Sequence, residues 1–165
     1  DETLLTRAEA RVMQRKFDEA AEDLTTWTHN IIKTSNFSGD LTPEGIQEFY
    51  NGVEYWTSDT PTIKKHLNPS FYIGEEGGVM ECMLQCVLGL KRIDMIAQGL
   101  RWLDVKRYGI EITRPPLQPD AAAGQYDASM KILNGEVDIL KVDDPRRAMQ
   151  IPADVVEAGL EPNPR

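Results

Sequence analysis

The sequence of 165 residues predicts an all-α fold with a small β ribbon near the C-terminus. Apolar residues recur every three or four positions through much of 3–32, 43–56 and 79–97, which is the period of a helix face. After Gly109 the pattern changes, and 110–113 and 137–142 read as short strands. We expect one domain in four parts, residues 1–33, 34–78, 79–109 and 110–165.

The first part predicts a pair of antiparallel helices. Residues 3–15 and 17–32 each carry an apolar face, and a tight turn at Arg15-Lys16 joins them. Small and large residues follow tetratricopeptide spacing at Ala8, Phe17, Ala20 and Leu24. Repeats of this kind need about three units to bury their faces. The other units would therefore lie elsewhere in the protein or be absent from this chain.

The second part predicts one helix and a long irregular segment. Thr42 can cap a helix that has Pro43 at its first position, and the apolar period then continues to about Trp56. Residues 34–41 and 57–78 are rich in Ser, Asn, Gly, Asp and Pro, which favours loops. Loops on a rigid scaffold often carry ligand contacts.

The third part predicts a buried helix followed by a short one. Apolar residues cover most of the circumference from Val79 to Ala97, and Gly99 then interrupts the helix. About twenty residues at 1.5 Å each would span roughly 30 Å. In the short helix that follows, we predict a structural corner of Arg101, Trp102, Asp104 and Arg107, in which Asp104 reaches both arginines. A catalytic role for Asp104 is the alternative, although no His or Cys accompanies it in sequence.

The fourth part predicts the ribbon and a last short helix. Residues 110–113 and 137–142 would pair as antiparallel strands, and 118–134 would form a loop or a short helix between them. Pro152 can open a helix over 153–158 that Gly159 ends.

Composition excludes several classes of function. A net charge of −9 argues against binding nucleic acid, whose phosphates need basic partners. Cys82 and Cys86 are four residues apart on the buried helix, a spacing that suits free thiols better than a zinc site or a disulfide. We assign no role to His29 or His66, and we expect no metal site and no cofactor.

No catalytic motif is present in the sequence, so we expect a protein that is not an enzyme. The acid pairs at 75–76 and 143–144 could act as a glycosidase dyad, but adjacent carboxylates in polar stretches are more typical of solvated surface. Aromatic residues offer a better candidate site, because sugars stack on exposed rings. Rings gather at 50–56 and 71–72, and from these we select Tyr55, Trp56 and Tyr72 as ligand-binding candidates.

Three blocks of the sequence resemble the C-terminal part of SusD/RagB-family proteins. The middle block, Gln98-Gly99-Leu100-Arg101-Trp102-Leu103-Asp104-Val105-Lys106-Arg107, is similar to the family's Glu-Gly-x-Arg-Trp-x-Asp-Leu-Lys/Arg-Arg. Arg7-Ala8-Glu9-Ala10 with 20–24 resembles the helical pair that precedes it in the family. Asp144-Pro145-Arg146-Arg147, 150–152 and 162–164 are similar to the family's ending. The family usually has Glu where this sequence has Leu90 and Gln98, so the helix carries less charge than the family pattern. Lys91 replaces an Arg and Asp94 replaces a Glu.

The resemblance implies a nutrient-binding lipoprotein of the outer membrane. Such a protein captures glycan, or in some members peptide, and covers a SusC-like TonB-dependent transporter without bond chemistry. Family members are longer and begin with a signal peptide and a lipidated Cys, so the resemblance implies that this chain is a C-terminal portion. It would contact the membrane only through a lipid anchor that this chain lacks.

Two other functions remain open from the sequence. A tetratricopeptide-like interaction scaffold would show an apolar groove on the 1–33 face and no exposed rings near 50–72. A glycan-active enzyme would need two carboxylates roughly 5 to 9.5 Å apart in a cleft.

Overall fold

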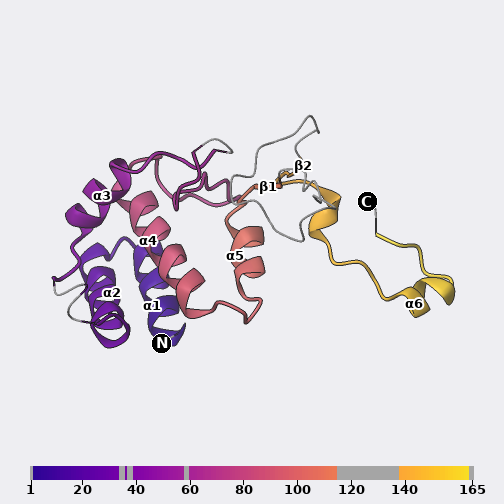
Figure 1. The fold of residues 1–165 in the computed structure, drawn as a ribbon, viewed down its shortest axis with the longest axis horizontal. Helices are drawn as coiled ribbons and strands as arrows, with labels where there is room; N and C mark the ends of the chain where they lie inside the picture. Colours follow the sequence, from indigo (N-terminus) through magenta and orange to yellow (C-terminus); the bar gives the residue numbers. More distant parts are fainter. Residues whose placement is uncertain (1, 34–35, 37–38, 58–59, 115–137, 164–165) are drawn as a thin grey trace, which may run out of the picture.

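Helix α4 (Val79–Asp94) lies at the centre of the fold and contacts four other helices (Figure 1). The computed structural model describes residues 2–33, 36, 39–57, 60–114 and 138–163. Around α4 pack α1 (Glu2–Met13), α2 (Phe17–Ile31), α3 (Pro43–Asn51) and α5 (Arg101–Arg107). A two-stranded ribbon and the short helices η1 (Pro145–Arg147) and α6 (Ala153–Glu157) complete the described part. The prediction of a mainly helical fold with a small ribbon is confirmed.

Helices α1 and α2 form the predicted hairpin. Their turn passes through Arg15, which adopts φ +60°, a left-handed conformation that usually favours glycine. Between the helices, the buried carboxylate of Asp23 lies 2.6 Å from guanidinium nitrogens of both Arg7 and Arg11. The rest of the buried surface is mainly apolar, with Leu5, Val12 and Leu24 fully enclosed.

Helix α3 begins as predicted but ends earlier. The Thr42 hydroxyl accepts a hydrogen bond from the Gly45 amide at 3.1 Å, and Pro43 occupies the first helical position. The helix ends at Asn51, with Gly52 as its C-cap, and does not reach Trp56. The expectation that Tyr55 and Trp56 share a helix is therefore wrong.

Helix α4 is buried on all sides over residues 80–88, as the apolar pattern predicted. It ends at Asp94, five residues before Gly99, and is thus shorter than expected. Ile96, which belongs to the apolar stretch predicted to be buried up to Ala97, is 78% exposed. Two left-handed residues, Ala97 (φ +69°) and Gly99 (φ +75°), turn the chain into α5. Cys82 and Cys86 are free and buried, as expected.

The chain leaves α5 through Gly109, whose φ is +57°. Strands β1 (Ile112–Arg114) and β2 (Asp138–Leu140) then pair antiparallel, with Thr113 opposite Ile139. The predicted ribbon is confirmed, with shorter strands than expected. The segment 118–134, predicted as a loop or a short helix, lies outside the described residues.

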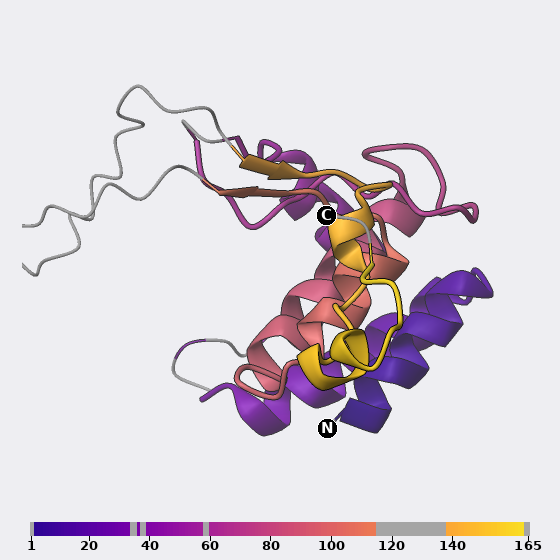
Figure 2. The same ribbon diagram turned by 90° about the vertical axis from the view of Figure 1, so that its right-hand side faces the viewer.

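Arg147 holds the C-terminal segment against α5. Its buried guanidinium donates hydrogen bonds to the carbonyl groups of Val105, Ile110 and Leu140 at 2.7–3.2 Å. Beyond it, α6 has no buried residue and lies away from the helical body on the right in Figure 1, the side that faces the viewer in Figure 2. Gly159 follows α6 with φ +102°, as predicted for a helix end.

Candidate functional site

An open pocket of about 320 Å³ lies between the loop after α3 and the ribbon. We call it the ribbon pocket. Its walls combine one large aromatic ring with hydroxyl, charged and imidazole groups. They are formed by Trp56, Thr57, Lys65, His66, Glu111, Thr113 and Ile139. The volume is within the usual range of small-ligand sites, about 300–1,000 Å³.

A closed loop positions Trp56 in this pocket. The chain leaves α3 at Gly52 and becomes extended, and Tyr55 forms an isolated parallel bridge with Lys64. The Trp56 amide donates to the Lys64 carbonyl at 2.8 Å, and the Thr62 hydroxyl donates to the Glu54 carbonyl at 2.7 Å. These backbone contacts fix the ring on a loop, where the sequence pattern had suggested a helix end.

Lys65 covers one face of the Trp56 ring. Its ammonium nitrogen lies 3.3 Å from the ring centre, which is a cation–π contact. Burial, followed by the positive charges of Arg101 and Arg92, lowers the pKa of Lys65 to about 8. A ligand that stacks on this ring must therefore displace the Lys65 ammonium or use the other face.

Tyr55 is half-buried beside the pocket but does not line it. Its ring stacks on the His66 ring, with centroids 3.9 Å apart, and Lys64 lies 4.3 Å from its centre. Its hydroxyl is buried without a hydrogen-bond partner among the described residues, and burial raises its pKa. His66 in turn contacts Glu76, with Nδ1 and Oε1 2.6 Å apart. Tyr55 thus supports the ring of a pocket residue.

Tyr72 lies apart from Trp56. It is 66% exposed, and Arg15 from the α1–α2 turn lies 5.7 Å from its ring centre. Neither Tyr72 nor Arg15 is among the residues of the ribbon pocket. Of the three candidates, Trp56 therefore lines the ribbon pocket, Tyr55 supports it through His66, and Tyr72 is not part of it.

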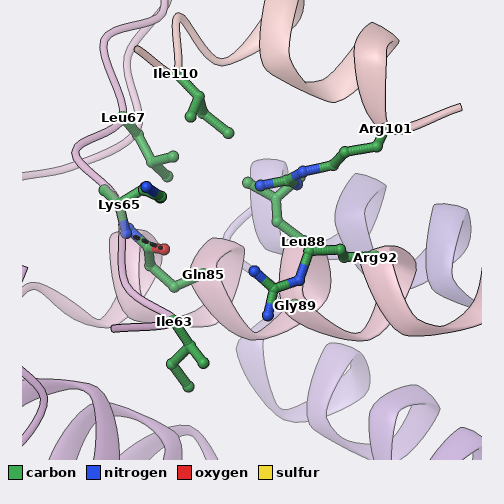
Figure 3. Close-up of a pocket in the computed structure, with 9 residues that line it drawn as sticks. All are labelled: Ile63, Lys65, Leu67, Gln85, Leu88, Gly89, Arg92, Arg101 and Ile110. Atoms are coloured by element: carbon green, nitrogen blue, oxygen red, sulfur yellow. Dashed lines mark hydrogen bonds between the residues drawn. The ribbon is translucent and has the colours of Figure 1, made fainter. Parts of the chain in front are cut away.

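A second, smaller pocket of about 10 Å³ adjoins the first, and Lys65 belongs to both (Figure 3). We call it the cation pocket, because Lys65, Arg92 and Arg101 point towards it. The Gln85 side-chain amide donates hydrogen bonds to the Lys65 carbonyl and, at 2.7 Å, to the Glu81 carboxylate. Apolar side chains complete the wall, among them Leu67, Leu88 and Ile110. The sequence gives no sign of this pocket, because its three cations are far apart in the chain.

The predicted corner in α5 is only partly formed. Arg101 Nη1 lies 3.7 Å from Asp104 Oδ2, close enough for an ion pair but too far for a hydrogen bond. Burial raises the pKa of Asp104, whereas the charges of Lys91 and Arg101 oppose that change. Trp102 is half-buried and packs against the core. The predicted contact between Asp104 and Arg107 is wrong, because Arg107 turns to Glu9, 3.5 Å away.

Glu9 connects three helical segments from inside the core. It accepts a hydrogen bond from the Tyr108 hydroxyl at 2.6 Å and forms a buried ion pair with Lys91. Burial opposes its ionisation, but the hydrogen bonds from Lys91 and Tyr108 outweigh this effect and lower the pKa of Glu9. The Arg-Ala-Glu-Ala block therefore supplies a structural carboxylate, which its sequence alone did not indicate.

The acid pairs do not resemble a glycosidase dyad. Glu76 contacts His66, and Asp144 caps η1 by accepting from the Arg146 amide at 2.8 Å. Hydrogen bonds from Arg146 lower the pKa of Asp144, whereas a general acid needs a raised one. Within the residues that the structure describes, no three His, Cys, Asp or Glu side chains are grouped to hold a metal ion.

None of the helices in the described ranges is both long and apolar enough to span a bilayer. Comparison with known proteins adds no assignment: no protein-family model, no curated protein and no solved structure matches the chain.

Proposed function

We propose that this protein binds glycan without bond chemistry and delivers it for import. It would act at the outer-membrane surface, next to a SusC-like TonB-dependent transporter. The resemblance of three sequence blocks to SusD/RagB-family proteins supports this role. The observation that carries it is the ribbon pocket, whose lining combines the Trp56 ring with hydroxyl and charged side chains.

The chemistry of the pocket suits a sugar. An indole ring packs against the C–H face of a pyranose, and polar groups at the rim hydrogen-bond its hydroxyls. Thr57, His66 and Thr113 supply such groups around Trp56. The pocket volume of about 320 Å³ has room for one or two sugar rings.

The distribution of exposed apolar residues argues against the scaffold alternative. Among the described residues of the 1–33 hairpin, Ile31 is the one large apolar side chain that is exposed. Near 49–72, by contrast, Phe49, Ile63 and Tyr72 are exposed. A groove for a partner on the hairpin face, which the scaffold needs, is thus poorly supported.

The experiment is a calorimetric screen of neutral and acidic oligosaccharides and of short peptides. It uses the wild-type chain and two variants, Trp56→Ala and Tyr72→Ala, with folding checked by circular dichroism. We expect saturable glycan binding that Trp56→Ala weakens about five- to thirtyfold, because a stacked ring contributes about 1–2 kcal/mol. Tyr72→Ala is the matched control, an exposed ring outside the pocket, and should bind like the wild type.

Three results would contradict this proposal. Binding of peptides but of no glycan would show that the ligand is a peptide. Glycan binding that survives Trp56→Ala would move the site away from the ribbon pocket. A folded chain that binds no glycan would leave the interaction scaffold as the better account.

A further inference from the structure

Three cationic side chains converge on the cation pocket from separate segments. Lys65 comes from the loop after α3, Arg92 from the last turn of α4, and Arg101 from the start of α5 (Figure 3). The chain as a whole carries a net charge of −9. A group of three positive charges is thus a local exception to the overall charge.

Carboxylates balance this group poorly. Asp104 lies 3.7 Å from Arg101 and is the one acid in ion-pair contact with any of the three cations among the described residues. Arg92 is exposed and makes no ion pair or hydrogen bond within the described part of the chain. Arg101 Nη1 is buried and lacks a hydrogen-bond acceptor. Donors that are left without an acceptor at a buried position are costly, and a bound anion would satisfy them.

The three charges also act on one another. After burial, the charges of Arg101 and Arg92 lower the pKa of Lys65 to about 8. Burial lowers the pKa of Arg101, and Arg92 adds to that decrease. An anion between them would relieve this repulsion. Its binding to the three cations should therefore be more favourable in free energy than its binding to a single surface arginine.

The size of the pocket defines which group enters. A volume of about 10 Å³ holds one water-sized atom, which corresponds to one oxygen of a carboxylate or sulfate. Because Lys65 belongs to both pockets, the rest of the ligand would lie in the ribbon pocket. The Glu111 carboxylate lines the ribbon pocket and disfavours a further anionic group there.

Building on the function proposed above, we propose that the ligand is an acidic glycan. One oxygen of its carboxylate or sulfate enters the cation pocket among Lys65, Arg92 and Arg101, and the sugar ring lies beside Trp56 in the ribbon pocket.

The test compares an acidic glycan with its neutral ester and adds a glycan that carries a different anionic group. Oligogalacturonate, its methyl ester and a sulfated galacto-oligosaccharide of equal length are titrated calorimetrically into wild type, Arg92→Gln and Arg15→Gln. Arg92→Gln removes an exposed cation of the pocket, and Arg15→Gln removes an exposed cation 5.7 Å from Tyr72, outside it. Both variants make the same change in net charge. Inorganic sulfate serves as a fourth ligand that needs no sugar site.

We expect one or both acidic ligands to bind about tenfold more tightly than the ester, as befits a charge-assisted contact. Arg92→Gln should remove that advantage without changing the affinity for the ester, and Arg15→Gln should keep it. A preference for the uronate or for the sulfated sugar would identify the anionic group.

The outcomes separate this proposal from the function on which it rests. Equal binding of acid and ester, lost in Trp56→Ala, would overturn the acidic ligand and support glycan binding. An acid preference that Arg15→Gln reduces as much as Arg92→Gln would overturn the pocket, because net charge would explain it. Binding of sulfate alone, with no glycan bound, would overturn both proposals.

Discussion

Replacing Gly109 by alanine tests the packing of the α5 end against the loop. Gly109 has φ +57°, and a Cβ atom added there would lie 2.1 Å from the carbonyl oxygen of Asn68. That oxygen belongs to backbone, and the Asn68 amide donates to the Tyr108 carbonyl at 2.8 Å. The loop must therefore move as a whole to admit a methyl group.

The magnitude follows from three losses. A left-handed alanine costs about 1 kcal/mol, and the broken hydrogen bond between Asn68 and Tyr108 costs about 1 kcal/mol. Moving the loop also exposes part of Leu67, which contributes about 2 kcal/mol when it is buried. Since only part of Leu67 becomes exposed, we expect Gly109→Ala to lower the free energy of unfolding by about 3 kcal/mol, at the upper end of the usual range for point substitutions.

Gly99→Ala is the matched control. Gly99 also has a positive φ, +75°, but a Cβ atom there would have no neighbour within 4 Å. It should cost only the conformational term of about 1 kcal/mol. Urea unfolding followed by circular dichroism measures both variants. Equal losses for the two would refute the close approach of Asn68 to Gly109.

Three further predictions concern stability and are measured by urea or thermal unfolding. Glu9→Gln should cost about 3 kcal/mol, because it leaves Lys91 buried without its counter-ion. It should also make the free energy of unfolding depend less on pH in acid. In the wild type, the lowered pKa of Glu9 stabilises the fold at any pH above the pKa of Glu9 in the unfolded chain, and this contribution is lost as the pH falls through the lowered value. Arg147→Met should cost about 3 kcal/mol, since it strips hydrogen bonds from buried carbonyl groups. Arg15→Gly should be neutral or slightly stabilising, because glycine adopts φ +60° without strain.

The control for Glu9→Gln is Glu19→Gln, which removes an exposed partner of Arg11. Such surface pairs contribute about 0–1 kcal/mol. If both variants lost the same stability, the buried Glu9 network would not be a main support of the fold. A destabilising Arg15→Gly would show that the Arg15 side chain contributes more than its backbone conformation costs.

Local signals in the sequence predicted the elements whose causes are local. Thr42 and Pro43 mark the start of α3 through capping and ring geometry, and Gly159 marks the end of α6 through its positive φ. The apolar residues that cover most of the circumference of 79–97 predicted the buried helix. The helix ends were less predictable. Gly52 stops α3 although the apolar period continues to Trp56, because the extended chain there pairs with Lys64.

Contacts between distant segments could not be predicted from spacing. Arg107 lies three residues from Asp104, but Glu9 of another helix attracts it instead. The same is true of the cation pocket, since nothing in the sequence relates Lys65 to Arg92 or Arg101. Of the candidate ligand residues, Trp56 lies in a pocket, Tyr55 lies behind it and Tyr72 is elsewhere. Aromatic clustering in sequence thus located the loop but not the side chains that share one site.

The measurement that tests the central claim most directly follows the indole N–H signals by NMR during a glycan titration. The chain has three tryptophans, and their environments differ: Trp27 is 1% exposed, Trp102 is half-buried in the core, and Trp56 lines the ribbon pocket. We predict that a glycan shifts the Trp56 signal, saturably, and leaves the Trp27 signal in place. Saturable binding with no change at Trp56, or no glycan that binds the folded chain, would contradict the account.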